Sequence, residues 1–542
     1  MKLIAQSENI EDFLDSDFIY VDKTEYIYNL TKNFKRVFFS RPRRFGKSLT
    51  LNTIGTLFEK GVDPYFKGTW IYDKWDQDKY PVLHLSFLEY SKTDIDEFKE
   101  MFSLSISDFA KTLGYDDVVT SRNPNRAVIE LFNVLNKDDR QIVILIDEYD
   151  CQLTANINNP PLYDEFRNCL RDFYAVLKGK KQIKFMAVTG VTRLKDVSIF
   201  SVGSDIQDLS YENDYSTMIG FTRAEIKKFY IDYLKQGISY EKEKSTDAVS
   251  DDEIDELLDR IATNYDGFSF DEFYKNKVFS TYSVNIFLQS IYRKKCMDFG
   301  DYWYSVGGLP SILMKYMESH NLNIESLLSS EIAIPYNDFV NPTSLIDINE
   351  NVLMCQTGYL TLKSVIDRND DVILGIANRE VRTALFSLIG LRLFKKNVSP
   401  YDSDRKYILE LGTADDIIKL FNEVLAALSY DKYPVNDEPV LRALLQVYLL
   451  GKEHDVRVEQ HNSKGRSDII VNFPERRVVL ELKYTDKTSE EQKKLEEAEH
   501  QIIEKGYGLE NLGDRELIQI ACVFNGEKSK RQITMYKNIE KA

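Results

Sequence analysis

Three polar residues near the C-terminus have the types and the spacing of a metal-dependent phosphodiesterase site. Asp468 lies in SDIIVNF (467–473), and Glu481 and Lys483 lie in RVVLELKY (477–484). Two carboxylates can hold Mg²⁺ against a phosphate, while a lysine can position water and stabilise the charge that develops. We therefore predict catalysis by these three residues, with Asp468 and Glu481 as metal ligands.

The spacing between the two segments can be tested by assuming a hairpin that turns at Pro474-Glu475. In that register Asp468 lies opposite Glu481, and directly opposed Cβ atoms are about 4.5–5.5 Å apart. Lys483 points to the same side, because side chains alternate along a strand. On the opposite face of the hairpin the paired residues are apolar, Ile469 with Leu480 and Val471 with Val478. The alternative is an amphipathic hairpin with a solvated charged face.

A second candidate site lies near the N-terminus in SRPRRFGKSLT (40–50). An apolar strand comes before this segment and a helical pattern follows it, as in a phosphate-binding loop at a helix N-terminus. Lys47 is expected to neutralise phosphates, and Ser48 to hold Mg²⁺. The glycine that usually opens such a loop is replaced by Arg41, so a chance Gly-Lys-Ser sequence is the alternative.

Acidic residues that suit this loop end another apolar strand. IVILIDEYD (142–150) ends in Asp147 and Glu148, and ligands of open α/β sheets bind at the carboxyl ends of strands. We predict that Asp147 holds Mg²⁺ and that Glu148 polarises the attacking water. Thr189, at the end of a further strand, and Arg193 after it are weaker candidates for nucleotide contacts, with ordinary turn chemistry as the alternative.

The first 210 residues alternate apolar strands with helical patterns, which predicts an open α/β fold with a buried parallel sheet. The expected strands are 35–40, 81–87, 141–150 and 183–190. The expected helices are 46–59, 93–113, 124–136 and 161–178.

Beyond residue 210 helices dominate. Thr222 and Glu225 form a capping-box pattern, and 250–265 is an amphipathic helix with a solvated acidic face. We expect β structure at 351–364 and 371–381. From about 431, a helix (438–450), two strands, a charged helix (489–505) and a last strand (517–524) predict a compact α/β domain.

The amino-acid composition restricts the kinds of partner and compartment that we expect for this protein. The net charge of −17 argues against a generally basic nucleic-acid coat but not against a local basic groove. Five dispersed cysteines indicate no zinc site or disulfide framework, which fits a reducing cytoplasm. No apolar run approaches the 18 residues or more of a membrane span, and the N-terminus lacks a signal-peptide pattern, so we expect a cytoplasmic protein without a membrane partner.

Five segments carry a family resemblance: YVDKTEYI (20–27), SRPRRFGKSLTLNT (40–53), VILIDEYD (143–150), VTGVTRL (188–194) and CQTGYLTLK (355–363). Together they resemble the bacterial AAA-ATPase-like proteins that carry a C-terminal PD-(D/E)XK nuclease domain. GRSDIIV and VLELKY match the nuclease motifs of that family. The resemblance covers essentially the whole chain, and in that family an arginine-rich loop replaces the leading glycine.

The resemblance implies an α/β multidomain protein. A P-loop NTPase-like domain (1–210) would precede a helical, winged-helix-like middle region (211–430) and a restriction-endonuclease-like α/β domain (431–542). It implies an ATPase and a nuclease that use ATP and Mg²⁺, with Mn²⁺ as an alternative at the nuclease site. The partner would be DNA or RNA, and a homo-oligomer stays open.

The resemblance also extends the set of site residues. Glu438 matches the upstream acid of the nuclease motif, and Gln501 resembles a helix residue that follows the E-x-K strand. The nucleotide loop would comprise Arg41, Pro42, Arg43, Arg44, Phe45, Gly46, Lys47, Ser48 and Leu49. We expect its three arginines to add positive charge beside Lys47. A nucleotide-switched binding module with a non-cleaving nuclease-like domain remains the alternative function.

Overall fold

The computed structural model describes residues 2–14, 18–194, 205–305, 311–320, 322–394, 403–452, 454–461 and 466–539. The chain forms two compact units. The first consists of residues 1–320 and 331–380, and the second of residues 321–330 and 381–542. The predicted middle region (211–430) is therefore divided between them.

The first unit contains a five-stranded parallel sheet in the order β2-β3-β4-β1-β5. Its strands are β1 (Arg36–Ser40), β2 (Val82–Ser86), β3 (Ile142–Asp147), β4 (Ile183–Gly190) and β5 (Gln207–Asp208). Every residue of β1 and β3 is buried, as their continuous apolar sequences predict. The four predicted strands and the open α/β architecture are confirmed.

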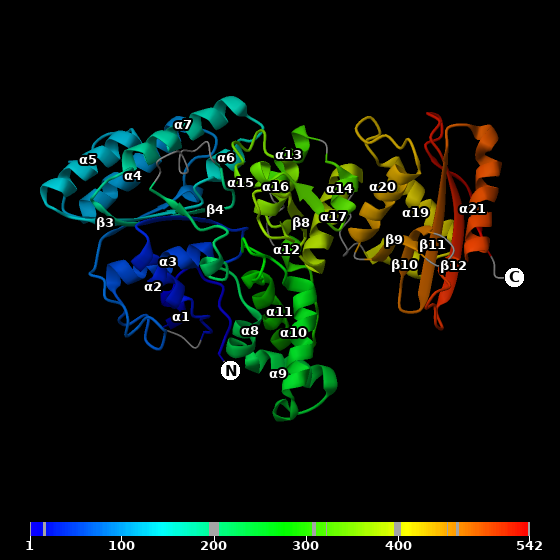
Figure 1. Ribbon diagram of the computed structural model, residues 1–542, viewed down its shortest axis with the longest axis horizontal. Helices are drawn as coiled ribbons and strands as arrows, with labels where there is room; N and C mark the ends of the chain where they lie inside the picture. The colour runs from blue at the N-terminus through cyan, green and yellow to red at the C-terminus, as the bar shows by residue number, and fades with distance from the viewer. Residues whose placement is uncertain are drawn as a thin grey trace. The chain divides into compact units, whose positions relative to one another are not determined.

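Helices cover both faces of this sheet. Figure 1 shows α3 on one face and α4, α5 and α7 on the other. The helices of this region are α1 (Glu11–Leu14), α2 (Thr24–Asn33), α3 (Lys47–Lys60), α4 (Ile95–Thr112), α5 (Pro124–Lys137), α6 (Cys151–Ala155) and α7 (Pro160–Leu177). The carboxyl ends of β1, β3 and β4 therefore lie at one edge of a sheet that is enclosed on both faces.

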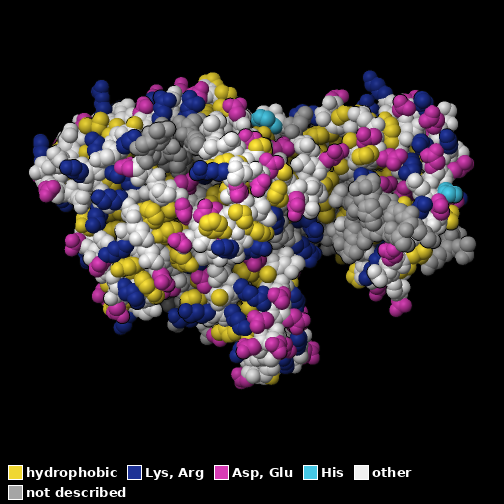
Figure 2. Space-filling view, in the orientation of Figure 1, with side chains coloured by type: hydrophobic (Ala, Val, Ile, Leu, Met, Phe, Trp, Pro, Cys, Tyr) yellow, Lys and Arg dark blue, Asp and Glu magenta, His cyan; other side chains and the backbone are white. Residues whose placement is uncertain are grey.

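A helical part follows the sheet in the same unit. Its helices are α8 (Arg223–Phe229), α9 (Ile231–Lys242), α10 (Asp251–Tyr265), α11 (Thr281–Lys294), α12 (Tyr302–Ser305) and α13 (Ser311–Ser319). The predicted capping box of Thr222 and Glu225 begins α8. Figure 2 shows side chains of both charge signs over α9 and α10, where Lys244 pairs with Glu253 and Arg260 with Glu241. The acidic run of α10 is thus a solvated face, as predicted.

A three-stranded antiparallel sheet completes the first unit, in the order β6-β8-β7. Its strands are β6 (Ile332–Ile334), β7 (Leu360–Leu362) and β8 (Val372–Ile376). Two helices lie between β6 and β7 in the chain, α15 (Tyr336–Val340) and α16 (Glu350–Gln356). β7 and β8 lie in the two stretches predicted to contain β structure, while the first part of 351–364 belongs to the helix α16. The Asn349 side chain caps this helix, and a short apolar run does not by itself distinguish strand from helix.

The second unit contains a mixed sheet in the order β13-β12-β11-β10-β9. Its strands are β9 (Asp455–His461), β10 (Arg466–Asn472), β11 (Arg476–Thr485), β12 (Glu516–Asn525) and β13 (Gln532–Asn538). The helices are α14 (Ile324–Leu328), most of α17 (Arg379–Phe394), α18 (Ser403–Leu411), α19 (Ala414–Ala426), α20 (Glu438–Leu450) and α21 (Glu491–Lys505). Within this unit α21 packs on β11 and β12, and α20 on β9, β10 and β11.

Two further findings bear on the compositional predictions. All five cysteines are free thiols. No helix within the described ranges combines the length and the apolar character that a membrane crossing requires.

Candidate functional site

The segment between β1 and α3 has the backbone of a phosphate-binding loop. Gly46 has a φ of 102° immediately before the helix, in the left-handed region that favours glycine. Lys47 is the first residue of α3, and its Nζ donates to the carbonyl oxygens of Arg41 (3.0 Å) and Pro42 (3.2 Å). Burial lowers the pKa of Lys47, while Glu148 and Asp147 act against that decrease.

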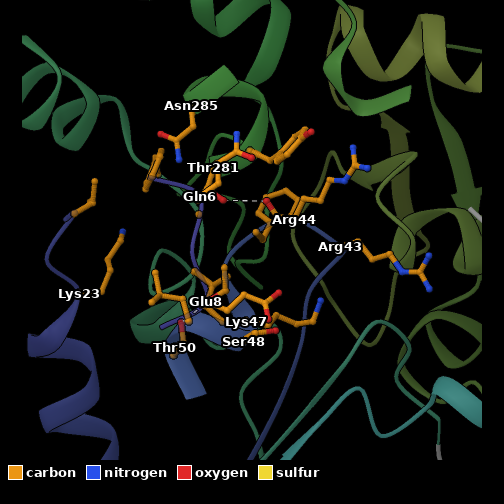
Figure 3. Close-up of a pocket in the computed structure, with 18 of the residues that line it drawn as sticks. Gln6, Glu8, Lys23, Arg43, Arg44, Lys47, Ser48, Thr50, Thr281 and Asn285 are labelled. Atoms are coloured by element: carbon orange, nitrogen blue, oxygen red, sulfur yellow. Dashed lines mark hydrogen bonds between the residues drawn. The ribbon is translucent and has the colours of Figure 1, made fainter. Parts of the chain in front are cut away.

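A cavity of ≈ 700 Å³ opens beside this loop. Residues 43–50 form its phosphate-loop wall, and Glu148 reaches it from the end of β3. Figure 3 shows Lys47, Ser48 and Thr50 together at one end of the cavity. Its volume falls within the range of small-molecule and cofactor sites.

The acid pair predicted after β3 lies next to Lys47. Burial raises the pKa of Glu148, which Lys47 opposes, and Glu148 has a φ of 51°. Asp147 is buried and accepts a hydrogen bond from the Thr189 hydroxyl. The structure thus brings Lys47, Asp147, Glu148 and Thr189 together, as a metal–phosphate site of this type requires.

Arg41 lies elsewhere than the sequence suggests. We expected this arginine beside Lys47, but its guanidinium is buried and donates to the carbonyl oxygens of Ser40 (2.8 Å) and Ser210 (2.7 Å). It also lies over the Phe270 ring, 4.2 Å from the ring centroid. Arg41 therefore joins the start of the loop to the segment after β5, and its donors do not face the cavity.

Arg44 and Phe45 join the same loop to the helical part. Arg44 donates to the carbonyl oxygens of Tyr302 and Trp303, each at 3.2 Å, and stacks on Tyr282. The Phe45 ring contacts Phe268 and Phe270 edge-on. Most of the arginine-rich sequence therefore positions the loop instead of adding charge beside Lys47.

Arg43 is the exception among the three arginines. It lines the cavity, and within the described residues the structure gives it no hydrogen bond or ion pair. Figure 3 shows its side chain extending away from Lys47 and Ser48. Among the arginines of the loop, Arg43 is thus the one whose donors stay available to a ligand.

Arg193 also differs from its predicted role. Its Nε pairs with Asp208, and its Nη1 donates to the Val340 carbonyl. The side chain of Gln356 receives a hydrogen bond from the Arg193 backbone N–H at 3.3 Å. These contacts place Arg193 in a structural ion pair within the first unit, away from the cavity lining.

A buried carboxylate that the sequence did not suggest supports the Arg44 contact. Glu380 accepts hydrogen bonds from the backbone N–H groups of Tyr302 (2.7 Å) and Trp303 (2.8 Å) through Oε1. Its Oε2 accepts from the Ser283 hydroxyl at 2.8 Å. Burial raises the pKa of Glu380 to about 7. Glu380 thus fixes the turn whose carbonyls bind Arg44.

In the second unit, β10 and β11 form the predicted hairpin. Ile469 pairs with Leu480 and Val471 with Val478, so the next position on the ladder places Asp468 opposite Glu481. All three candidate side chains are buried: Asp468 is 9% exposed, Glu481 3% and Lys483 7%. The alternative of a solvated charged face is therefore excluded.

The three residues and Glu438 form one polar cluster. Lys483 Nζ lies 3.2 Å from Glu481 Oε1 and 3.4 Å from Glu438 Oε2, and it donates to the Leu482 carbonyl at 3.1 Å. Burial acts to lower the pKa of Lys483, but Glu481, Glu438 and Asp468 together raise it. Burial raises the pKa of Glu481 to about 7, with a further contribution from Asp468.

Arg442 belongs to this cluster, although no sequence pattern indicates it. It lies one turn after Glu438 on α20 and donates to Asp468 Oδ1 at 2.9 Å. The Leu482 N–H donates to the other oxygen of Asp468 at 2.8 Å. An arginine in a largely apolar helix is usually predicted to lie at the surface. Only the packing of α20 on the sheet shows that Arg442 is a member of the cluster.

One carboxylate oxygen of the cluster is placed to bind a divalent cation. Glu481 Oε2 is buried, and within the described residues it has no hydrogen-bond partner. An orphaned buried carboxylate oxygen is costly unless a cation binds it. Among the described residues no three His, Cys, Asp or Glu side chains group as a metal site, so Asp468 and Glu481 would be the two side chains that hold the ion.

Gln501 lies on α21, which packs on β11 and β12. It is half-buried, and its Oε1 is enclosed without a hydrogen-bond partner among the described residues. The structure therefore does not support the alternative of a plain surface glutamine, while its assigned role stays a prediction.

Comparisons with known proteins match one region near each end of the chain. The family model described as predicted AAA-ATPase matches residues 7–200, which include Lys47 and Glu148. The family model described as PD-(D/E)XK nuclease superfamily matches residues 436–533, which include Asp468 and Lys483. The chain thus has the predicted architecture, and the parallel and mixed sheets confirm the predicted fold class.

Two individual proteins are also similar. A protein of Azotobacter chroococcum mcd 1, described as "uncharacterized protein in vnfD 5′ region", is 27% identical over 507 residues, covering 91% of this chain and 90% of that protein. The crystal structure of Cdc6p from Pyrobaculum aerophilum matches 69% of this chain and 93% of its own, at 10% identity and a TM-score of 0.26. A TM-score this low carries no conclusion about this chain.

Proposed function

We propose that this chain, which joins an AAA-ATPase-like region to a PD-(D/E)XK nuclease-superfamily region, binds and hydrolyses ATP and cleaves phosphodiester bonds in nucleic acid. Both activities would depend on Mg²⁺, with Mn²⁺ as an alternative at the nuclease site. The observation that carries the nuclease proposal is the buried cluster of Asp468, Glu481 and Lys483, in which Glu481 Oε2 has no partner in the part of the chain that the structure describes. Binding alone would not require two opposed acids and a lysine.

In the nuclease site the chain's own residues have separate tasks. Asp468 and Glu481 would hold the metal ion, which when bound polarises a phosphoryl oxygen and lowers the pKa of water. Lys483, fixed between Glu481 and Glu438, donates to the scissile phosphate or orients the attacking water. The burial of Lys483 strengthens its electrostatic effect, because water screens it less.

In the nucleotide site Lys47 neutralises the phosphates. The Ser48 hydroxyl and Asp147 would hold Mg²⁺, and Glu148 orients the attacking water. The raised pKa of Glu148 makes its carboxylate a stronger proton acceptor for that water. Thr189 fixes the Asp147 carboxylate through its hydroxyl.

A cleavage assay on single- and double-stranded DNA and RNA, with Mg²⁺ or Mn²⁺ and with or without ATP, tests the nuclease proposal. D468N, E481Q and K483A should each lower the cleavage rate by at least about 100-fold. E475Q changes an exposed carboxylate in the turn of the same hairpin and should leave the rate unchanged. Wild-type cleavage by D468N would refute the assignment.

One observation favours a second candidate, a nucleotide-switched module that binds nucleic acid without cleaving it. Both oxygens of Asp468 already accept hydrogen bonds, from Arg442 and from the Leu482 N–H. If the chain binds nucleic acid tightly but cleaves none of the four substrates with either metal, this second function is favoured. ATP-dependent changes in that binding would then define the switch.

A further inference from the structure

The cavity beside the phosphate loop has a second end, formed largely by the helical part of the first unit. Asn285, on the second turn of α11, lines the same cavity as Lys47 and Ser48. Figure 3 shows Asn285 directed into the cavity, on the far side from Lys47 and Ser48. A nucleotide whose phosphates lie at Lys47 would therefore bring its base toward Asn285.

The position of Asn285 is tied to the phosphate loop itself. The Thr281 hydroxyl and the Tyr282 N–H both donate to the carbonyl oxygen of Arg44, at 2.9 Å and 3.4 Å. Asn285 follows Thr281 by four residues, so the two lie on one face of α11. The first turn of α11 is therefore hydrogen-bonded to the loop. The second turn of the same helix carries Asn285, which lines the cavity.

One orientation of the Asn285 amide is fixed by a buried partner. The Tyr230 hydroxyl donates to Asn285 Oδ1 at 2.7 Å, and Tyr230 is 2% exposed. The Nδ2 group then remains as the donor, and the structure assigns it no acceptor among the described residues. An amide held by its oxygen offers two N–H donors to a ligand.

The surroundings of Asn285 favour a flat, largely apolar ligand group. Apolar side chains line the cavity that Asn285 also lines, beside polar ones such as Gln6: Ile19, Val21, Ile27, Met218, Ile219 and Phe221. Lys23 also lines the cavity, but its Nζ already bonds to Glu225 and to the Thr217 carbonyl. Figure 3 shows Glu8 away from Asn285.

We propose that Asn285 determines base specificity by donating a hydrogen bond from Nδ2 to a ring nitrogen of adenine. This inference rests on the proposed nucleotide-binding function and names the part of the ligand that the helical region recognises. The ring nitrogen that distinguishes the two purines is N1, which is an acceptor in adenine but carries a hydrogen in guanine, so guanine would set its N1–H donor against the Nδ2 donor of Asn285. Buried donors without acceptors disfavour binding, so ATP should bind more tightly than GTP.

The test compares the full-length wild type with N285D by calorimetry, with ATP, GTP and inorganic tripolyphosphate as ligands in Mg²⁺ buffer. Aspartate can still accept from Tyr230 but cannot donate to the base. ATP binding should weaken about tenfold, the effect of one lost hydrogen bond, and the ATP-over-GTP preference should narrow. Tripolyphosphate, which has no base, should bind N285D as it binds the control. N136D makes the same change at an exposed asparagine of α5 and serves as that control.

Each outcome decides between defined alternatives. Equal ATP affinity of N285D and N136D would overturn the role of Asn285 while leaving nucleotide binding intact. An equal loss for ATP and tripolyphosphate would also overturn it, because Asn285 would then shape the whole cavity. A wild type that binds neither ATP nor GTP would refute the proposed function itself, and the specificity with it.

Discussion

At the scale of single residues, the buried carboxylate of Glu380 has a measurable consequence for stability. The pKa of this carboxyl is about 7 in the folded chain, against an ordinary value of 4.5. The folded state therefore binds the proton more tightly than the unfolded state does. Stability should fall as the pH rises from about 4.5 to about 7, by about 3 kcal/mol in all.

E380Q should remove this dependence. Glutamine can accept from the Tyr302 and Trp303 N–H groups through its oxygen and can donate to Ser283 in place of accepting from it, without a charge to desolvate. The variant should match the wild type at pH 5 and unfold at a higher temperature at pH 8. Calorimetric melts across that range measure the difference, and a less stable E380Q at pH 8 would show that the charge itself is needed.

Which site residues the sequence could predict depends on how locally each one is specified. Asp468, Glu481 and Lys483 were predictable because one tight turn sets their register. Arg442 pairs with Asp468 across 26 residues, and Glu380 bonds Ser283 across 97, so neither pairing leaves a periodic signal. The loop arginines were predicted as charges near phosphate, but the partners of Arg41 and Arg44 come from distant segments that no local pattern reveals.

At the scale of elements, the turn after α16 packs directly on the phosphate loop. A Cβ added at Gly358, which has a φ of 87°, would lie 2.8 Å from the Pro42 Cβ and 3.0 Å from Trp303. Thr357 and Tyr359, on either side, line the cavity. This turn of the CQTGYLTLK segment therefore supports the loop from the three-stranded part of the unit.

G358A should destabilise the first unit by about 2–4 kcal/mol, since it combines a left-handed backbone with overpacking. It should also weaken ATP binding, because Pro42 cannot keep its place. G68A is the matched control: Gly68 has a φ of 85°, but a Cβ there would meet nothing within 4 Å, so only the backbone cost of about 1 kcal/mol applies. Thermal melts that shift equally in both variants would contradict the packing argument.

The elements themselves were predictable where apolar sequence is continuous and long. β1, β3 and β4 were found because each is buried along its length. β9 and β13 were not found, since DVRVEQH and QITMYKN carry charged and polar residues typical of the edges that these strands form. α16 was not predicted as a helix, because its apolar run is too short to show helical periodicity.

At the scale of the whole molecule, the chain consists of two compact units with separate sheets, and each holds one candidate site. A ligand that binds only the folded state stabilises the unit that holds its site. Differential scanning calorimetry should therefore resolve two transitions that respond to different ligands. With Mg²⁺ present before and after its addition, ATP should raise the temperature of one transition, and Mn²⁺ added to metal-free protein without nucleotide should raise that of the other.

Site variants assign the two transitions. At ATP concentrations about 100 times the Kd, the first unit should gain about 2.7 kcal/mol. K47A should abolish that gain, whereas K137A, at an exposed lysine of α5, should keep it. D468N should abolish only the response to Mn²⁺. If both ligands instead raise one shared transition, the two units unfold cooperatively, and nucleotide binding would then stabilise the nuclease-like sheet as well as its own.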